Sequence, residues 1–425
     1  MSARTTPKAL IWMALGAAAL AFAVQLLLPP ETAIIHGCGG VDYNVYRAAA
    51  QVVLGGESLY DRAVAHNPEL GFTYPPFAVL VFVPMAVFPR LTGETLHLLI
   101  SVLALALVIA RTLECALENK GGVRRDGALV FTSIAFSIGA ISLEPVQSTL
   151  WFGQLNIVLM ALVFLDLCPS RSRPGAPGRW QGFGVGLAAG LKLTPLVFVP
   201  YLLLTRQWRA AATAVATFAG TVLLGFVVIP HDSAKFWTSV GQTTRVGPLA
   251  WPSNQAVEGT LARIWAPHDA PKALFYALAL VLGGAGLLLG AYAYRRSERV
   301  LAVILVGLVA CVVSPIAWSH HWVWVAPLAV WLVAKALPDA DATPGNRPAP
   351  AWALAATALC LWVFVWPNNQ TSLSFNKSAE PASIGVFWLQ HGPIWLRNAL
   401  GAWYLYAYLA ILFCSWRHLR QKTPA

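Results

Sequence analysis

Asp42 is a candidate catalytic carboxylate in the part of the chain where ionisable side chains are most concentrated, His36 to Arg90. A carboxylate in such a stretch can act as a general base that takes a proton from a hydroxyl group. It can also cap a helix, because Asp42 directly precedes a short amphipathic pattern, Tyr43 to Val53, that two glycines end. The sequence alone leaves both roles open.

Two adjacent histidines, His320 and His321, lie at the end of an apolar segment, within Ser314 to Trp322. Such a pair can ligate a metal, bind phosphate when protonated, or form structural hydrogen bonds beside interfacial tryptophans. Neighbouring side chains on a helix point about 100° apart, so both are not expected to bind one ion. The pattern favours contact with a phosphate or a sugar, and structural hydrogen bonding is the alternative.

Amide side chains form two further polar groups, one in Glu144 to Asn156 and one around Asn254. Gln154 and Asn156 stand where an apolar segment resumes, and Arg263 follows Asn254 by nine residues. Amides carry donors and acceptors together, which suits sugar hydroxyls. They could equally cap helix ends.

Lys192 interrupts the apolar stretch from Gly182 to Leu204. An ionisable residue inside a membrane segment is a functional candidate by default, because burying its charge is costly. It could meet a lipid phosphate at the headgroup level, or it could extend its ammonium group to water.

The composition determines which elements must position these residues. Apolar residues make up 57% of the chain, Asp, Glu, Lys and Arg together only 11%, and 18 residues are Trp. This is outside the usage of soluble domains, and repeated apolar runs of about 17 to 25 residues fit helices that cross a hydrocarbon core of about 30 Å. The chain is therefore predicted to be an all-α polytopic membrane protein.

The net charge of +11 does not indicate nucleic-acid binding, because the basic residues form short clusters at the ends of apolar segments, as membrane topology requires. The six cysteines suggest neither a disulfide framework nor a zinc site. Twelve membrane segments are predicted, with an uncleaved first helix and both termini in the cytoplasm. The predicted segments are 8–28, 92–113, 127–143, 155–168, a two-segment hairpin over 182–204 with Lys192 at its tip, 208–230, 272–294, 299–316, 321–337, 351–366 and 394–416.

The segment from Tyr74 to Phe88 is also apolar, but it is short and starts with two prolines. If it crossed the membrane, basic clusters would be placed outside, so a helix at the outer interface is the better interpretation. Most of the chemically interesting residues then share one face. The predicted outer segments are 29–91, 144–154, 231–271, the turn at 314–321 and 367–393.

Several motifs in this order together resemble glycosyltransferase family 87, which comprises polyprenyl-phosphate-mannose-dependent mannosyltransferases of actinobacterial envelopes. The resemblance covers nearly the whole chain; each motif is weak singly, and the ordered set is specific. The motifs are Asp42-Tyr43-Asn44-Val45-Tyr46-Arg47, Gly56-Glu57-Ser58-Leu59-Tyr60, Phe72-Thr73-Tyr74-Pro75-Pro76-Phe77, Gly153-Gln154-Leu155-Asn156, Lys192 before Pro195, Ser253-Asn254-Gln255, and Ser314 to Trp322.

The resemblance implies a single GT-C membrane domain over 1–425, whose first extracytoplasmic loop carries the catalytic carboxylate, Asp42, on juxtamembrane helices. It implies a polyprenyl-phosphate-mannose donor, a mannolipid acceptor of the phosphatidylinositol mannoside or lipomannan type, an α-1,2 linkage and a plasma-membrane location. No cofactor is expected, since no acidic Asp-X-Asp pair that would hold a metal stands in the outer loops.

We assign roles to further residues as hypotheses within that resemblance. One set would hold the donor phosphate, and the other would bind sugar hydroxyls or the substrate more generally. The phosphate set is Lys192, Arg263 and one of His320 or His321; the second set is Tyr46, Arg47, Tyr74, Gln154, Asn156 and Asn254.

A transporter or flippase for a lipid-linked sugar is the competing class of function. It predicts ionisable groups near the middle of the bilayer and two related halves. The polar residues here gather at one face and no half-repeat is visible. The enzyme is therefore the favoured interpretation.

Overall fold

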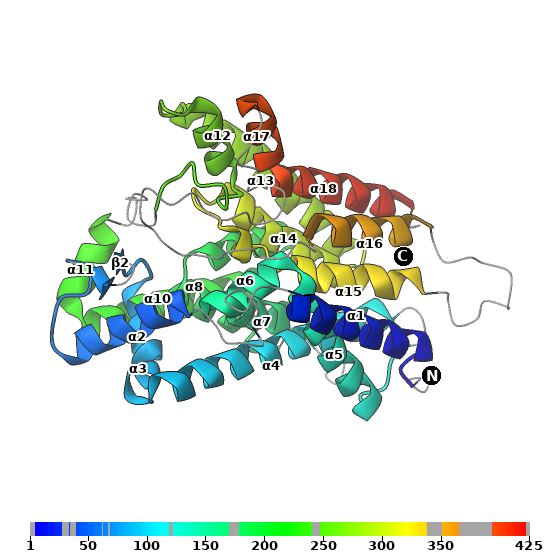
Figure 1. The fold of residues 1–425 in the computed structure, drawn as a ribbon, viewed down its shortest axis with the longest axis horizontal. Helices are drawn as coiled ribbons and strands as arrows, with labels where there is room; N and C mark the ends of the chain where they lie inside the picture. Colours follow the sequence, from blue (N-terminus) through cyan, green and yellow to red (C-terminus); the bar gives the residue numbers. More distant parts are fainter. Residues whose placement is uncertain are drawn as a thin grey trace, which may run out of the picture.

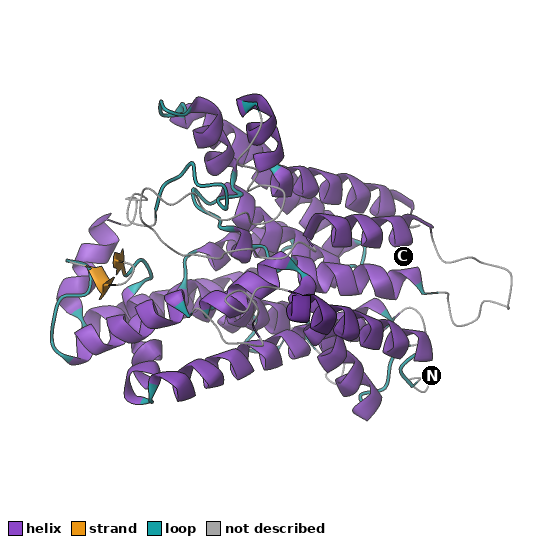
Figure 2. Ribbon diagram, in the orientation of Figure 1, coloured by secondary structure: helices purple, strands orange, loops and turns teal. Residues whose placement is uncertain are grey.

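The computed structural model describes residues 5–27, 34, 40–61, 63–66, 69–118, 122–169, 178–239, 247–337, 351–364 and 393–421. Within these ranges the fold is helical apart from one short antiparallel hairpin of β1 (Ala63–His66) and β2 (Glu69–Gly71) (Figure 2). The helical prediction is confirmed, and the hairpin was not foreseen. The predicted loop 367–393 lies outside the described residues except for its last residue.

Among the described residues, four helices are long and apolar enough to cross a membrane: α1 (Lys8–Leu27), α4 (Arg90–Ala116), α10 (Trp208–Val228) and α13 (Lys272–Arg295). Large side chains on them, such as Val227 and Leu280, are 79% and 76% exposed, which suits contact with lipid. The chain is thus a multi-pass membrane protein.

A bent pair of elements gives a fifth candidate span. The helix α5 (Gly127–Gly139) continues into the 3-10 turn η3 (Ala140–Ser142), and α6 (Glu144–Phe152) leaves it at an angle of 90°. The other predicted spans correspond to shorter helices: α7 (Asn156–Leu167), α8 (Phe183–Leu191), η4 with α9 (Thr194–Val197 and Phe198–Leu204), α14 (Arg299–Val313), α15 (Val325–Ala336), α16 (Ala351–Phe364), and the pair α17 (Ile394–Gly401) and α18 (Trp403–Gln421).

The predicted first loop contains two helices, α2 (Val41–Leu54) and α3 (Pro76–Val87). Both match their sequence signals, because Gly55 ends α2 and the Pro-Pro pair starts α3. They pack through Tyr46 and Phe82, whose rings stack at 4.4 Å. The capping hypothesis for Asp42 is wrong. The residue before α2 is Gly40, no side chain caps the helix, and Asp42 lies in its first turn.

The break at Lys192 was predicted correctly, and the contacts of α10 indicate that α8 and α9 run in opposite directions. Gly182, just before α8, packs against the start of α10 at Ala210, and Gly190 packs against Thr221 further along it, so α8 and α10 are parallel. Since α9 ends only a short turn before α10 begins, α9 must return toward the level where α8 started. Lys192 therefore lies at the tip of a short helical hairpin.

Most of the predicted outer segment 144–154 forms the helix α6. Every residue from Glu144 to Trp151 is buried, including hydroxyl and amide side chains. Glu144, Ser148 and Thr149 are engaged in hydrogen bonds inside the protein, which the sequence pattern alone does not reveal.

Two more helices occupy the predicted outer segment 231–271, namely α11 (Pro230–Ser239) and α12 (Val257–Trp265). Figure 1 shows both termini at one end of the long axis of the molecule, and α2, β2 and α11 at the other end. The polar first loop and the termini are therefore far apart.

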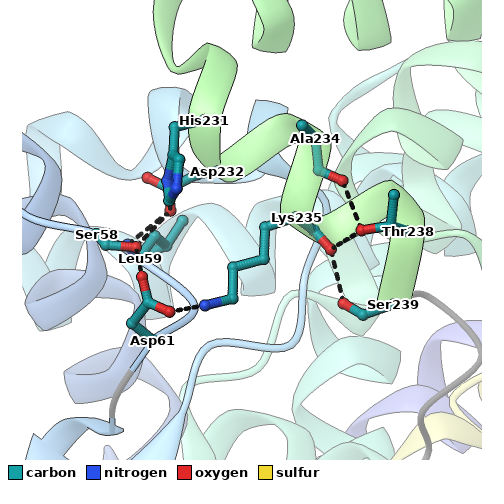
Figure 3. A network of polar contacts seen from close by, with 9 residues as sticks. All are labelled: Ser58, Leu59, Asp61, His231, Asp232, Ala234, Lys235, Thr238 and Ser239. Atoms are coloured by element: carbon teal, nitrogen blue, oxygen red, sulfur yellow. Dashed lines mark hydrogen bonds and ion pairs between the residues drawn. The ribbon is translucent and has the colours of Figure 1, made fainter.

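A polar network fastens the first loop to α11 (Figure 3). The Asp232 Oδ1 atom accepts hydrogen bonds from the Leu59 backbone N–H at 2.9 Å and from the Ser58 hydroxyl at 3.0 Å. Ser58 also donates to Asp61, which forms an ion pair with Lys235. The segment that follows α2 is thereby held in place from a helix more than 170 residues away.

Replacing Asp232 with Ala is expected to destabilise the protein by about 1–3 kcal/mol, because the buried Leu59 N–H loses its acceptor. Thermal unfolding in detergent would measure the change. Thr238→Ala is the control, since among the described residues the exposed Thr238 hydroxyl bonds only carbonyls of its own helix. Equal shifts for the two variants would contradict this account of the network.

Candidate active site

Asp42 is held by a glutamine that two tyrosines orient. The Gln154 side chain is hydrogen-bonded to the partly buried Asp42 carboxylate. Its Oε1 atom accepts from the Tyr46 hydroxyl at 2.9 Å and from the Tyr74 hydroxyl at 3.0 Å, and the two hydroxyl oxygens lie 2.8 Å apart. Because the tyrosines use the amide oxygen, the amide N–H groups are left to donate to Asp42.

Gly153 allows Gln154 to approach α2 this closely. It ends α6 with a φ of 70°, and a Cβ atom there would stand 2.7 Å from the Cβ of Tyr43. The Gly40 N–H also donates to the Trp151 carbonyl at 3.0 Å. A glycine at position 153 is thus required both by the backbone conformation and by the contact with Tyr43.

The environment of Asp42 suits a base that works near neutral pH. Burial raises the pKa of this carboxyl to about 6, while the Gln154 hydrogen bond and the positive charge of Lys192 act in the opposite direction. A base with such a pKa is ionised at neutral pH and still strong enough to accept a proton.

Lys192 points into the protein instead of extending to water. Its Nζ atom lies 3.1 Å from Asn156 Oδ1 and 3.1 Å from His321 Nε2, and 5.5 Å from the centre of the Tyr74 ring. Tyr74 therefore contacts both Lys192 and the glutamine that holds Asp42. These contacts bring seven of the predicted site residues to one place: Asp42, Tyr46, Tyr74, Gln154, Asn156, Lys192 and His321.

The histidines lie on the 3-10 turn η6 (Ser319–His321), and only His321 is hydrogen-bonded to Lys192. The backbone carbonyl of His320 accepts from the Thr149 hydroxyl at 2.7 Å and from the Asn156 amide at 3.0 Å. Burial, and then the charge of Lys192, lowers the pKa of both imidazoles well below the usual value. Both are therefore neutral at physiological pH, and Lys192 supplies the positive charge.

A small pocket opens beside this cluster. It is lined by Asn156, Lys192 and His321, and by apolar side chains of α7, α14 and the hairpin. A mixed lining of this kind fits the polar head of a lipid.

Two predicted site residues, Asn254 and Arg263, are used elsewhere. The Asn254 side chain donates to the Leu249 and Pro315 carbonyls and accepts from the Ala256 and Ala317 N–H groups. It is fully buried, so its donors and acceptors are engaged in joining two loops.

The guanidinium of Arg263 donates to the backbone carbonyls of Trp251, Asn254 and Gly401 and to the Thr260 hydroxyl. These contacts hold the α12 loop against the end of α17. Arg47, on α2, has a partly buried side chain whose positive charge acts to lower the pKa of Tyr43. Among the described residues, Arg47 does not contact Asp42 or Lys192. We accordingly take Asn254 and Arg263 as structural residues.

Sequence reasoning missed Thr149, and it noted Glu144 only as one member of the polar group from Glu144 to Asn156. Thr149 holds the His320 carbonyl, and Glu144 accepts the Ser319 hydroxyl at 2.8 Å. Their hydroxyl and carboxyl groups in an otherwise apolar region were the available signal.

Comparison with known proteins identifies the family. The sequence profile of glycosyltransferase family 87 matches residues 72–315, more than half of the chain. The chain belongs to glycosyltransferase family 87. It is therefore a glycosyltransferase, and the transporter alternative is unsupported. Asp42, Tyr46, His320 and His321 lie outside the matched residues, so their assignment depends on the geometry described above.

The chain is similar to curated members of this family. It is 38% identical over 304 residues, 68% of each chain, to a polyprenol-phosphate-mannose-dependent alpha-(1-2)-phosphatidylinositol mannoside mannosyltransferase of Mycobacterium tuberculosis. It is 35% identical to a protein of the same description from Mycolicibacterium smegmatis, over 77% of this chain and 75% of that one.

A third relative, also from Mycolicibacterium smegmatis, is a polyprenol-phosphate-mannose-dependent alpha-(1-2)-phosphatidylinositol pentamannoside mannosyltransferase. It is 34% identical over 70% of each chain. No solved structure matches the chain.

Proposed function

We propose that this glycosyltransferase moves mannose from polyprenyl-phosphate-mannose to a phosphatidylinositol mannoside, forming an α-1,2 linkage. The names of three family 87 relatives support the donor, the acceptor and the linkage. The observation that carries the mechanism is the meeting of one carboxylate and one ammonium group, Asp42 and Lys192, across Tyr74 and Gln154.

The reaction is a single inverting displacement. An acceptor hydroxyl attacks the anomeric carbon of the β-linked mannosyl unit, and the bond between that carbon and the phosphate oxygen breaks. Asp42 takes the hydroxyl proton as general base. The electron pair leaves with the polyprenyl phosphate, and the new glycosidic bond has the α configuration.

Lys192 is assigned to the donor phosphate. Its charge offsets the negative charge that grows on the phosphate as the sugar leaves, and His321 and Asn156 orient it. Because both histidines are neutral, His321 would contribute a hydrogen bond to the phosphate and not a second charge. Tyr46 and Gln154 lie beside the carboxylate, where they would contact the reacting sugars.

The membrane arrangement is part of the same proposal. A GT-C body of twelve segments, with cytoplasmic termini and the site at the extracytoplasmic face of the plasma membrane, agrees with the position of the termini at the end opposite α2 and α11 (Figure 1). The hairpin supports it further, since α8 has nine residues, about 14 Å, and does not cross a core of about 30 Å.

The proposal is tested by incubating the purified chain in detergent with radiolabelled polyprenyl-phosphate-mannose and a phosphatidylinositol mannoside. We expect label in the mannolipid and an α-1,2 linkage in the product by NMR. Transfer to lipomannan but not to the phosphatidylinositol mannoside would show that lipomannan is the acceptor. No transfer to either would reject the proposed function.

The pKa of Asp42 predicts the pH dependence of the reaction. Only the ionised carboxylate is a base, so kcat/KM should be about half its plateau value near pH 6 and fall about tenfold per pH unit well below it. Steady-state rates between about pH 4.5 and 8 would measure this acidic limb of the pH–rate profile. A limb near pH 4, the ordinary value for Asp, would show that burial does not tune this group.

A further inference from the structure

Glu144 is a fully buried carboxylate that the mechanism above does not use. Its Oε1 atom accepts from the Ser148 hydroxyl at 2.7 Å and from the Ser319 hydroxyl at 2.8 Å, and its Oε2 atom accepts from the Tyr404 hydroxyl at 2.7 Å. The residue is 0% exposed. A buried carboxylate needs such donors, because an unsatisfied one would be strongly destabilising.

The three donors come from different parts of the chain. Ser148 lies one turn along the same helix, α6, whereas Ser319 lies on the histidine turn and Tyr404 at the start of α18. Glu144 thus joins segments 175 and 260 residues away in the sequence. A hydrophobic residue could fill this volume, so the polar junction has a use other than packing.

That use concerns the histidine turn. Its three residues follow one another directly: Ser319 is held by Glu144, the His320 carbonyl is held by Thr149 and Asn156, and His321 contacts Lys192. Because Glu144 and Thr149 both lie on α6, one rigid helix fixes two consecutive residues of the turn.

We propose that Glu144 is a positioning residue for donor binding: its carboxylate fixes the Ser319–His321 turn so that His321 holds Lys192 against the donor phosphate. This inference rests on the proposed function. Glu144 itself does not touch the reacting atoms, and it acts through the Ser319 hydroxyl.

A carboxylate suits this position better than an amide of the same shape. Three hydroxyl groups donate to its two oxygens, and a glutamine would offer only one acceptor oxygen together with two N–H donors. At least one hydroxyl would have to reorient in a buried site with few alternatives. Glu144→Gln is therefore expected to disturb the turn although it preserves size.

The test compares two serines that donate to the same carboxylate oxygen. Ser319→Ala cuts the link between Glu144 and the turn, whereas Ser148→Ala removes a donor within α6 and leaves that link in place. Ser319→Ala should raise the KM for polyprenyl-phosphate-mannose about tenfold, the effect of one lost hydrogen bond, with the acceptor KM unchanged. Ser148→Ala should change the donor KM less than about twofold, and Glu144→Gln should resemble Ser319→Ala.

Three results would overturn the proposal: equal effects of the two serine variants, parallel changes in both substrate KM values, or a loss of thermal stability without a change in donor KM. If Glu144→Gln fails to fold, the comparison of Ser319→Ala with Ser148→Ala still tests the proposal. An unmutated protein that transfers no mannose would reject the proposed function, whereas an active protein with a normal Ser319→Ala variant would reject only the positioning role.

Discussion

Asp42→Asn should abolish most mannose transfer while the protein still folds and binds its donor. Asparagine preserves the size of the side chain and can still contact Gln154, but it cannot accept the proton of the acceptor hydroxyl. General-base catalysis contributes about 10²- to 10⁴-fold, so the rate should fall by that factor. The measurement is the initial rate of label transfer at saturating donor, with the melting temperature as the check on folding.

Glu57→Gln is the matched control for this variant. Glu57 lies just after α2, in the same segment between α1 and α4, and is exposed, and the change also replaces a carboxylate with an amide. It should leave the rate within about twofold, since exposed substitutions rarely perturb a protein strongly. Full activity in Asp42→Asn, or an equal loss in Glu57→Gln, would exclude Asp42 as the base.

Lys192→Met is expected to lower the rate by about 10²- to 10³-fold, the loss typical of removing one group that stabilises negative charge in a transition state. Methionine preserves much of the unbranched stem, so the hairpin tip should stay packed. The donor KM should rise as well, because the phosphate loses its cation in the ground state. Steady-state kinetics with varied donor separates the two effects.

Lys8→Met provides the control for removing a lysine charge, because Lys8 is exposed at the start of α1. Lys192→Arg is informative in addition. It keeps the charge but changes the donor geometry toward Asn156 and His321, so it should recover only part of the rate. A normal rate in Lys192→Met would show that the phosphate binds elsewhere.

Local signals in the sequence were sufficient to predict the positions of several elements that carry the site. The two glycines after α2, the Pro-Pro pair before α3 and the polar break at Lys192 each act on the backbone within a few residues. Their positions could therefore be predicted. The gathering of Asp42, Tyr46, Tyr74, Gln154, Asn156, Lys192 and His321 was predicted as well, from their shared face in the predicted topology and from the family resemblance.

The remaining features depend on contacts between distant segments. Asn254 and Arg263 looked like substrate residues because amide and guanidinium groups suit sugars and phosphates. Their partners, such as the Ala317 N–H and the Gly401 carbonyl, are backbone groups that any residue type provides, so no sequence pattern identifies them. The choice between the two histidines likewise required the direction of each ring in the turn.

The burial of the helix α6 could not be predicted from its sequence either. Its hydroxyl and amide residues resemble a loop, yet Ser148 and Thr149 are satisfied by Glu144 and by the His320 carbonyl. A polar segment can be helical and buried when its partners lie elsewhere in the fold. The role of Glu144 could not be predicted without those partners.

We propose that Asp42 and Lys192 are the two ends of one donor site. A structure of the protein with a non-hydrolysable phosphonate analogue of polyprenyl-phosphate-mannose tests it most directly. We expect the phosphonate in hydrogen-bond contact with the Lys192 ammonium, and the mannosyl ring between it and the Asp42 carboxylate. An analogue bound with its phosphonate away from Lys192, or with Asp42 out of reach of the sugar, would contradict the account.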